Sequence, residues 1–221
     1  MPHLSAAGTL DLWQEAEGRA PAERSLTLAA AASGRPLDEL AALPIGERDA
    51  LLLELHAGET LDATAACPAC GEQAEFSVDT RALAARAAGA KPGKWRPPDS
   101  TDVAAAAATG DAEAAERVLL ERCAGSAELS PEERAAVVAA MAEADPLAEV
   151  LVDVSCPVCG EDFVADLDIG AFVWADVRSR AQRLLLEVDA LARAYGWTEA
   201  EVLALGERRR GAYLQLAGAG A

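Results

Sequence analysis

Two short segments, Cys67-Pro-Ala-Cys70-Gly71 and Cys156-Pro-Val-Cys159-Gly160, determine how this chain is organised. In each segment two residues separate the cysteines, so both sulfurs can face one ion, and the glycine that follows tolerates a tight turn. Together the segments supply four thiolates, the number that a tetrahedral structural zinc ion takes. The sequence therefore predicts one structural zinc ion with the ligands Cys67, Cys70, Cys156 and Cys159.

The residues that follow the two segments also correspond. An aspartate, Asp79 or Asp168, lies 12 positions after the first cysteine, and an apolar residue, Leu83 or Phe172, lies 16 positions after it. Residues 150–154, before the second segment, are rich in β-branched side chains, which is typical of a strand. We therefore expect each segment to cap a small β-hairpin. Two hairpins that bind one ion form a zinc ribbon.

The long separation of the two segments implies an insertion. Eighty-five residues lie between Cys70 and Cys156, whereas the cysteine pairs of such sites are usually about 15–20 residues apart. Closing the longer loop costs about 4 kcal/mol, and a structural zinc site contributes about 10–16 kcal/mol at neutral pH. The metal contribution is larger, so we expect a loop and helical insertion at residues 84–149 between the two halves of one ribbon.

The cysteines have alternative interpretations. A redox Cys-x-x-Cys site lies at the start of a helix after a strand, whereas strand-like residues continue beyond Cys159. Disulfides are the third interpretation. The fifth cysteine, Cys123, falls on the apolar face of a helix with Leu119 and Leu120, which favours a buried structural thiol over a ligand or a nucleophile.

Composition indicates a mainly helical protein. Of 221 residues, 52% are hydrophobic and only 4% are aromatic, so the core is built largely from Ala and Leu. The expected fold class is mainly α with a small β zinc ribbon (α+β). The expected regions are an N-terminal helical region at 1–60, a first hairpin at 61–83, the insertion at 84–149, a second hairpin at 150–170, a C-terminal helical region at 171–216 and a disordered tail at 217–221.

Local signals mark several helix ends. Residues 130–133, Ser-Pro-Glu-Glu, form a capping box with proline at the first helical position, and residues 198–201, Thr-Glu-Ala-Glu, form another. Gly196 is expected to end the long amphipathic helix before it. Ser100 or Thr101 is expected to cap the Ala-rich segment that follows them.

Charge argues against nucleic acid as a partner. The formal net charge is −18, and four thiolates with one Zn²⁺ change it by −4 + 2 to about −20, the opposite of what phosphate neutralisation requires. From Asp176 to the end of the chain, seven Arg accompany six acids, a net +1 that leaves −19 for the remainder. An Arg-bearing C-terminal region on an acidic body favours a protein-docking surface, and a solvated helix face is the alternative.

The sequence contains no signal for export or membrane insertion. The N-terminus has neither a basic segment nor an apolar stretch suited to export, and no run of about 18 apolar residues occurs. We therefore expect a cytoplasmic protein without a membrane span, in which the thiols stay reduced and available to a metal ion.

No group of residues predicts catalysis. The sequence has no Ser/His/Asp grouping, no phosphate loop and no helix with paired metal-binding histidines, and its two histidines are His3 and His56. His56 has no second ligand at metal-binding spacing, so it is interpreted as an ordinary helix-end residue. Asp79 and Asp168 recur after both cysteine segments, which favours hairpin ends or caps over catalytic carboxylates. We therefore expect a protein that is not an enzyme.

Several segments resemble one known family. Residues 191–205 and 208–214 resemble the closing segment of the bacteriophage baseplate proteins found in contractile tails and contractile injection systems. Residues 40–53 resemble the N-terminal helix pair of that family, both cysteine segments fit its motifs, and residues 96–102 are similar to its loop-to-helix segment. The resemblance covers most of the chain in pieces, and residues 103–129 fit many helical proteins.

The resemblance implies a non-enzymatic structural part of a baseplate, near the hub or the wedges around it. Such a part assembles with other baseplate subunits in a phage-tail-like particle. Aromatic and Arg side chains are favoured interface anchors, and for Trp197 and Tyr213 packing within the chain is the alternative. The expected partner contacts are Trp197, Arg208, Arg209, Arg210 and Tyr213. Two other functions stay open, a zinc-ribbon adaptor in transcription or RNA processing and a thiol redox enzyme.

Overall fold

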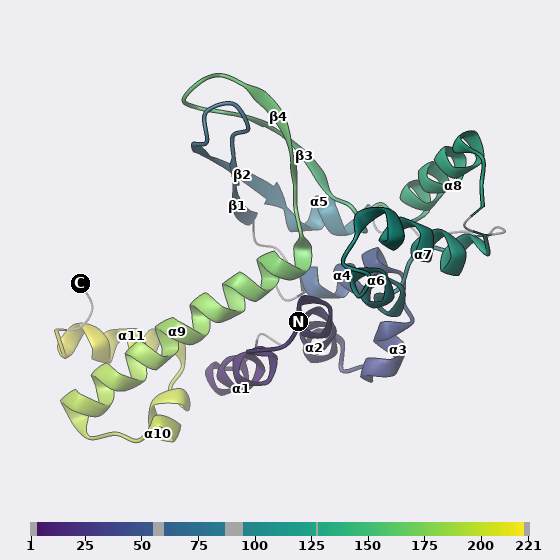
Figure 1. Cartoon of the computed structure of the whole chain (residues 1–221). Helices are drawn as coiled ribbons and strands as arrows, with labels where there is room; N and C mark the ends of the chain where they lie inside the picture. The colour runs from purple at the N-terminus through teal and green to yellow at the C-terminus, as the bar shows by residue number, and fades with distance from the viewer. Residues whose placement is uncertain (1–3, 55–59, 87–94, 127, 219–221) are drawn as a thin grey trace.

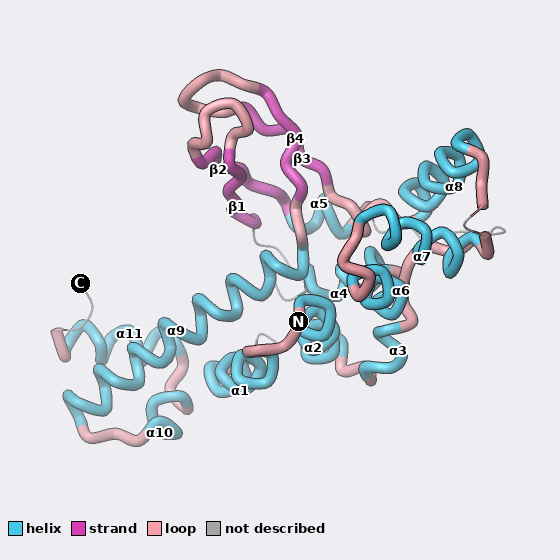
Figure 2. The backbone as a smooth tube through the Cα atoms, in the orientation of Figure 1, coloured by secondary structure: helices cyan, strands magenta, loops and turns pink. Residues whose placement is uncertain are grey.

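The computed structural model describes residues 4–54, 60–86, 95–126 and 128–218 (Figure 1). This part of the chain is mainly helical and contains two small antiparallel sheets of two strands each (Figure 2). The expected combination of a mainly α chain with a small β part is therefore confirmed. His3, His56 and the last residues of the expected tail, 219–221, lie outside the described residues. Among the helices that are described, none combines the length and apolar character needed to cross a bilayer.

Four N-terminal helices form a body around buried leucines. They are α1 (Ala6–Ala16), α2 (Pro21–Ser33), α3 (Leu37–Ala41) and α4 (Ile45–Leu53). Their apolar residues recur at helical spacing, so each helix has one face that is buried against the others. Leu28, Leu40 and Leu52 are fully buried in one core, which also contains residues of the hairpins and of the last long helix.

Two antiparallel hairpins extend from this body (Figures 1 and 2). Their strands are β1 (Thr60–Ala66), β2 (Gln73–Asp79), β3 (Leu151–Ser155) and β4 (Asp162–Asp166). The strand expected at residues 150–154 is therefore confirmed as β3. A short helix, α5 (Thr80–Ala84), follows the first hairpin directly, and the longest helix follows the second.

That longest helix connects the body to the C-terminal end of the molecule. It is α9 (Ile169–Tyr195), and it is followed by α10 (Glu199–Leu203) and α11 (Glu207–Leu216). Trp174 and Val177, in its first half, are buried in the core of the body. Its second half extends away from the hairpins, and α10 and α11 pack beside it (Figure 1).

The predicted capping signals are confirmed at three helix ends. Gly196, at φ 70°, ends α9 in the left-handed conformation that glycine adopts without steric conflict. Ser130 and Glu133 form the capping box of the last inserted helix, and Thr198 and Glu201 form that of α10. In each box two amides that have no partner within the helix are hydrogen-bonded to side chains. These helix ends are therefore predictable from a few neighbouring residues of the sequence.

After α5, three further helices lie between the two hairpins in the described part of the chain. They are α6 (Ser100–Ala107), α7 (Ala112–Ala124) and α8 (Pro131–Ala144). The expected cap of α6 was wrong, because Asp99, and not Ser100 or Thr101, is the N-cap. Asp99 accepts hydrogen bonds from the Thr101 and Asp102 amides, and Asp102 accepts one from the Asp99 amide. This reciprocal arrangement is a capping box that starts one residue earlier.

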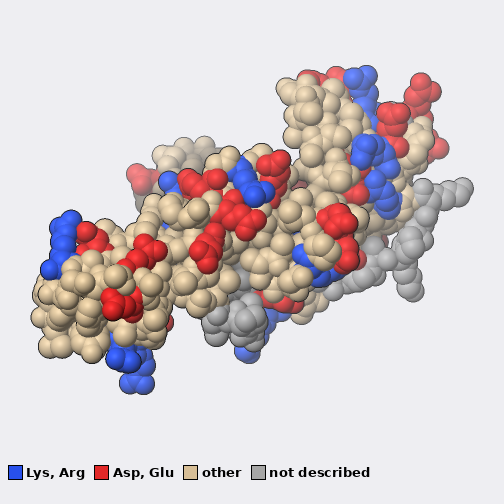
Figure 3. Space-filling view, turned by 90° about the horizontal axis from the view of Figure 1, so that it is seen from below, with Lys and Arg blue, Asp and Glu red and all other residues tan. Residues whose placement is uncertain are grey.

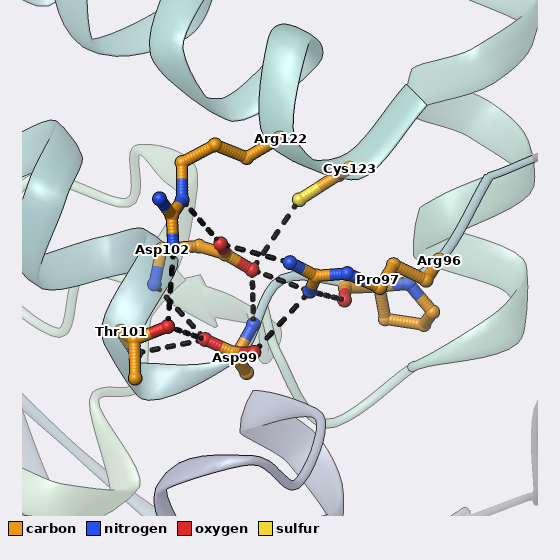
Figure 4. Close-up of polar contacts among 7 residues, drawn as sticks. All are labelled: Arg96, Pro97, Asp99, Thr101, Asp102, Arg122 and Cys123. Carbon is orange, nitrogen blue, oxygen red and sulfur yellow. Dashed lines mark hydrogen bonds and ion pairs between the residues drawn. The ribbon is translucent and has the colours of Figure 1, made fainter. Parts of the chain in front are cut away.

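A buried carboxylate connects the loop before α6 to the end of α7 (Figure 4). Asp102 is fully buried, and its Oδ1 accepts from Nη2 of Arg96 at 2.9 Å and from Nε of Arg122 at 2.6 Å. Burial by itself raises the pKa of Asp102, but the hydrogen bonds from Arg96, the Asp99 amide and Arg122 outweigh it and hold that pKa well below its usual range. Cys123 Sγ lies 3.5 Å from Oδ2, and Cys123 is the buried structural thiol that its helical position predicts.

Helix α4 approaches the segment after α8 most closely at Gly46. Its amide donates a hydrogen bond to Oδ2 of Asp145 at 2.9 Å. A Cβ atom at this position would overlap the Asp145 carboxylate and would lie 2.9 Å from the nitrogen of Ala148. Glycine is therefore required for the body to contact the segment that leads into β3.

We expect Gly46→Ala to destabilise the protein by about 2 kcal/mol, because the added methyl group has no space. The matched control is Gly211→Ala in α11, where a Cβ would meet no atom within 4 Å. That change should be neutral or stabilise by up to about 1 kcal/mol. Urea unfolding of both variants measures the difference, and equal stabilities would show that the Gly46 contact does not form.

We expect Asp102→Asn to lower the free energy of unfolding by about 2 kcal/mol at pH 7, because it leaves two arginines without their buried anion. The pKa of Asp102 is lowered by folding, so its contribution is complete above the ordinary carboxyl pKa of about 4 and is lost as the pH falls below that value. The difference between wild type and variant should therefore shrink below about pH 4.

Urea unfolding at several pH values measures this difference, with the exposed Asp11→Asn as the control, which should change stability by less than about 0.5 kcal/mol. The comparison isolates Asp102 from other carboxyl groups, such as Asp49, whose pKa burial raises to about 6. A difference that stays constant from pH 7 to pH 3 would contradict the network.

Candidate metal centre

The four cysteines of the two hairpins converge at one point. Their sulfur atoms all lie within 4.8 Å of one another. Each close pair joins the two hairpins, because the Sγ atoms of Cys67 and Cys159 are 3.6 Å apart and those of Cys70 and Cys156 are also 3.6 Å apart. These distances exceed a disulfide bond of about 2.05 Å, and all four thiols are free. The arrangement could therefore bind one metal ion.

The two turns that present the thiols have the same backbone geometry. The Cys67 amide donates to the Glu72 carbonyl at 2.8 Å, and the Cys156 amide donates to the Glu161 carbonyl at 2.8 Å. The glycines after the second cysteines adopt left-handed φ angles of 78° at Gly71 and 76° at Gly160. A side chain with a Cβ atom would be strained at this angle, so the predicted role of glycine in the turn is confirmed.

The hairpins below the turns share one register. Thr60 pairs with Asp79 in the first hairpin and Leu151 with Asp166 in the second. Cys156 lies 89 residues after Cys67. When 89 is subtracted from both residue numbers of any strand pair in the second hairpin, the result is a strand pair of the first hairpin. The sulfurs of both hairpins consequently lie at the same height above their strands.

Side-chain packing between the hairpins positions the thiols. Strand residues alternate between the two faces of each hairpin, so one face of each is apolar. Ala74 of the first hairpin and Val154 and Ala165 of the second are buried in a shared cluster, with Phe76 and Phe163 half-buried beside them. The cluster lies between the strands that carry the cysteines, and it brings two segments far apart in the sequence into contact.

The centre is half open to solvent. Cys67 and Cys156 are buried, whereas Cys70 and Cys159 are exposed. Hydrogen bonds from the amides of Cys159 and Val158 lower the pKa of Cys156 to about 7. The Glu72 amide acts to lower the pKa of Cys70, but desolvation and the neighbouring sulfurs raise it to about 12, because a second negative charge in the cluster is unfavourable. A bound cation removes that repulsion.

The aspartates that follow the two hairpins cap helices. Asp79 accepts from the amides of Arg81 and Ala82 at the start of α5, and Asp168 accepts from the Ala171 amide at the start of α9. The interpretation of both residues as caps is therefore confirmed. Each hairpin ends directly in a helix, so the orientation of the cysteine turns and that of α5 and α9 depend on each other.

The expected partner contacts lie at the other end of the molecule, on α11 and on the connection between α9 and α10 (Figure 1). Trp197 stacks on Tyr195 with ring centroids 4.8 Å apart and meets the ring of Tyr213 edge-on, also at 4.8 Å. Both Trp197 and Tyr213 are half-buried, so packing within the chain accounts for a large part of their surface. Their contact with a partner stays a prediction.

One of the three arginines does not belong to that surface. Arg210 is only 7% exposed, and its guanidinium donates to the Glu187 carboxylate and, at 3.0 Å, to the Leu205 carbonyl. This correction has a physical reason, since Arg210 lies on the face of α11 that packs against α9. Arg208 and Arg209 are exposed and remain the predicted contacts.

Figure 3 shows acidic and basic side chains interspersed over the face that it presents, without a continuous basic patch.

The comparisons of this chain with protein-family models, with curated proteins and with solved structures find no match.

We expect purified protein to contain one metal ion per chain and Cys156→Ser to release it, because the remaining thiols of both hairpins bind the same ion. The control is Cys123→Ser, which changes a buried thiol outside the centre and should keep one ion. Elemental analysis gives the metal content, and Co²⁺ absorption reports tetrahedral thiolate ligation. If Cys67 and Cys70 keep a full equivalent in Cys156→Ser, the single shared site is wrong.

Proposed function

We propose that the four cysteines hold one structural zinc ion and that the chain is a non-enzymatic structural subunit. The observation that carries this proposal is the convergence of four sulfurs from two hairpins within 4.8 Å. A zinc ion bound to four sulfurs at about 2.3 Å requires sulfur–sulfur distances of about 3.8 Å in a tetrahedron, close to the 3.6 Å of the two close pairs. Cys₄ ligation is the composition of a closed structural zinc site.

The local structure supports zinc over thiol redox chemistry. A redox Cys-x-x-Cys pair lies at a helix N-terminus, which lowers the pKa of its exposed thiol. Here both pairs lie in hairpin turns and are followed by the strands β2 and β4. The exposed thiols, Cys70 and Cys159, have raised pKa values, in spite of hydrogen bonds from the amides of Glu72 and Glu161. The raised pKa values leave few thiolates at these two exposed sulfurs at neutral pH, and Cys156, whose pKa is lowered, is buried.

The assembly that we propose is the baseplate of a contractile phage tail or of a contractile injection system. Support comes from the segments that resemble that family, above all the C-terminal residues 191–205 and 208–214. The acidic charge of −18 also disfavours a nucleic-acid adaptor. In this proposal the zinc ion stabilises the hairpins, and the C-terminal end, with Arg208 and Arg209, contacts another baseplate subunit.

The C-terminal contact should be tested by substitution rather than by removing residues from 176 onward. Val177, Ala181 and Leu191 of α9 are buried, so truncation there would remove part of the core. A charge reversal at exposed Arg209 leaves this packing unchanged and alters the surface hollow that Arg209 lines with Trp197 and Tyr213.

We expect Arg209→Glu to reduce co-purification with co-expressed baseplate proteins by about tenfold, since Arg side chains are frequent interface anchors. Arg178→Glu, an equal change at an exposed position of α9, should leave co-purification intact, and both variants should keep one zinc ion. Quantitative pull-down and elemental analysis measure these outcomes. Unchanged co-purification in Arg209→Glu would contradict the C-terminal contact. Binding of the wild-type chain to RNA or DNA that weakens with salt would favour a zinc-ribbon adaptor.

A further inference from the structure

Helix α8 has an apolar surface that the described part of the chain does not bury. Residues 135–142 form an uninterrupted apolar run, Ala-Ala-Val-Val-Ala-Ala-Met-Ala, which covers the whole circumference of the helix. A helix that is apolar on all sides normally lies in the interior of a protein. No described residue of α8 is buried, however, and Val138 is 50% exposed.

Helix formation alone does not explain this composition. Alanine favours a helix, but Val137 and Val138 at the centre of α8 are β-branched and weaken it. The capping box of Ser130 and Glu133 already fixes the start of the helix, and an isolated helix of this length is marginally stable in water. The two valines therefore add apolar surface that helix stability does not require.

A cleft of about 250 Å³ lies between α7, α8 and the segment that follows α8. Its apolar wall includes Leu119, Leu120, Val138, Met141 and Ala142. A space of this size takes one or two aliphatic side chains of an approaching helix. None of the residues that line the cleft belongs to a cysteine turn or to α9–α11, so the cleft is distinct from the metal centre and from the predicted C-terminal contact.

Carboxylates line the same cleft. Glu116 is paired with Arg134 at 3.4 Å, but neither Asp145 nor Glu149 forms an ion pair within the described residues. Asp145 accepts one hydrogen bond from the Gly46 amide, Glu47 adds a further negative charge beside it, and the nearby Arg48 is already paired with Asp49. Asp145 is buried, so the cleft combines an apolar wall with the exposed carboxylate of Glu149, which has no ion pair within the described residues.

We propose that this α7–α8 cleft is the docking site of an amphipathic helix from another protein, with an apolar stripe that covers Val138 and Met141 and with Lys or Arg beside the exposed Glu149. Helix-in-groove recognition uses such stripes at i, i+3, i+4 and i+7. A second copy of this chain is a poor occupant, because it carries the same charge of −18. Electrostatic attraction to a basic helix selects the partner, and burial of α8 supplies the affinity.

The test uses the full zinc-loaded chain and a labelled synthetic helix of about five turns, with Leu at the stripe positions and Lys at the others. We expect saturable binding that Val138→Asp and Glu149→Arg each weaken about tenfold. Leu186→Asp on α9 and Glu121→Arg on the outer side of α7 are matched controls and should bind as wild type does. Hydrogen exchange of the α8 amides should slow when the peptide is bound.

Several results would overturn the proposal. Equal weakening by the control variants would mean that the peptide is attracted by overall charge. Absence of hydrogen-exchange protection at α8 would show that the peptide binds elsewhere. Equal binding of a peptide with Glu in place of Lys would show that charge attraction does not select the partner. Self-association of the chain in ultracentrifugation that is lost in Val138→Asp would identify a second copy as the occupant.

Discussion

Contact between two hairpins that are far apart in the sequence is the constraint on which the rest of this structure depends. Their shared apolar cluster, with Ala74, Val154 and Ala165 buried, places four thiols within 4.8 Å. The cysteine turns are equivalent in backbone and register, so each hairpin contributes one buried and one exposed sulfur. An ion at this point would cross-link the chain on both sides of an 85-residue segment. The free energy of metal binding, rather than a large core, would then offset the entropy cost of closing this loop.

The inserted helices need their own attachment to the body, because the hairpins restrain only the two ends of the insertion. Two polar contacts provide it. Nη1 of Arg48 in α4 donates to Oγ of Ser100 at 2.9 Å, and the Gly46 amide donates to the Asp145 carboxylate. Both contacts are charge-assisted hydrogen bonds in partly dehydrated surroundings, where such bonds are stronger than in water. They explain how an Ala-rich segment with little bulky apolar surface occupies one position on the body.

The parts of the fold that were predictable depend on short-range chemistry. The cysteine spacing, the glycines of the turns and the capping boxes at Ser130 and Thr198 all involve residues within a few positions of one another. The α6 cap shows where this reasoning stops. Asp99, Ser100 and Thr101 are all residue types that can cap a helix. Asp99 is the N-cap in a capping box with Asp102, and Asp102 is also bound by the distant Arg122.

Contacts between residues far apart in the sequence could not be predicted in this way. Arg210 was expected on a partner surface because three arginines occur in a row, but it pairs with Glu187, 23 positions earlier, across two helices. Likewise the apolar run of α8 resembles any buried helix in the sequence, and only the arrangement of α7 and α8 reveals that it is uncovered. Periodicity identifies apolar faces, but it does not state whether the covering surface comes from the same chain.

The continuity of α9 has a mechanical consequence. It is a single helix of 27 residues, about 40 Å long, that begins at the Asp168 cap directly after the second hairpin and ends beside Trp197. A rod of this length acts as a lever, because a tilt of about 5° at Asp168 displaces the far tip by about 3–4 Å. Because Trp174 and Val177 in its first half are buried in the core of the body, the packing of the body around them sets how accurately the far end with Trp197 is aimed.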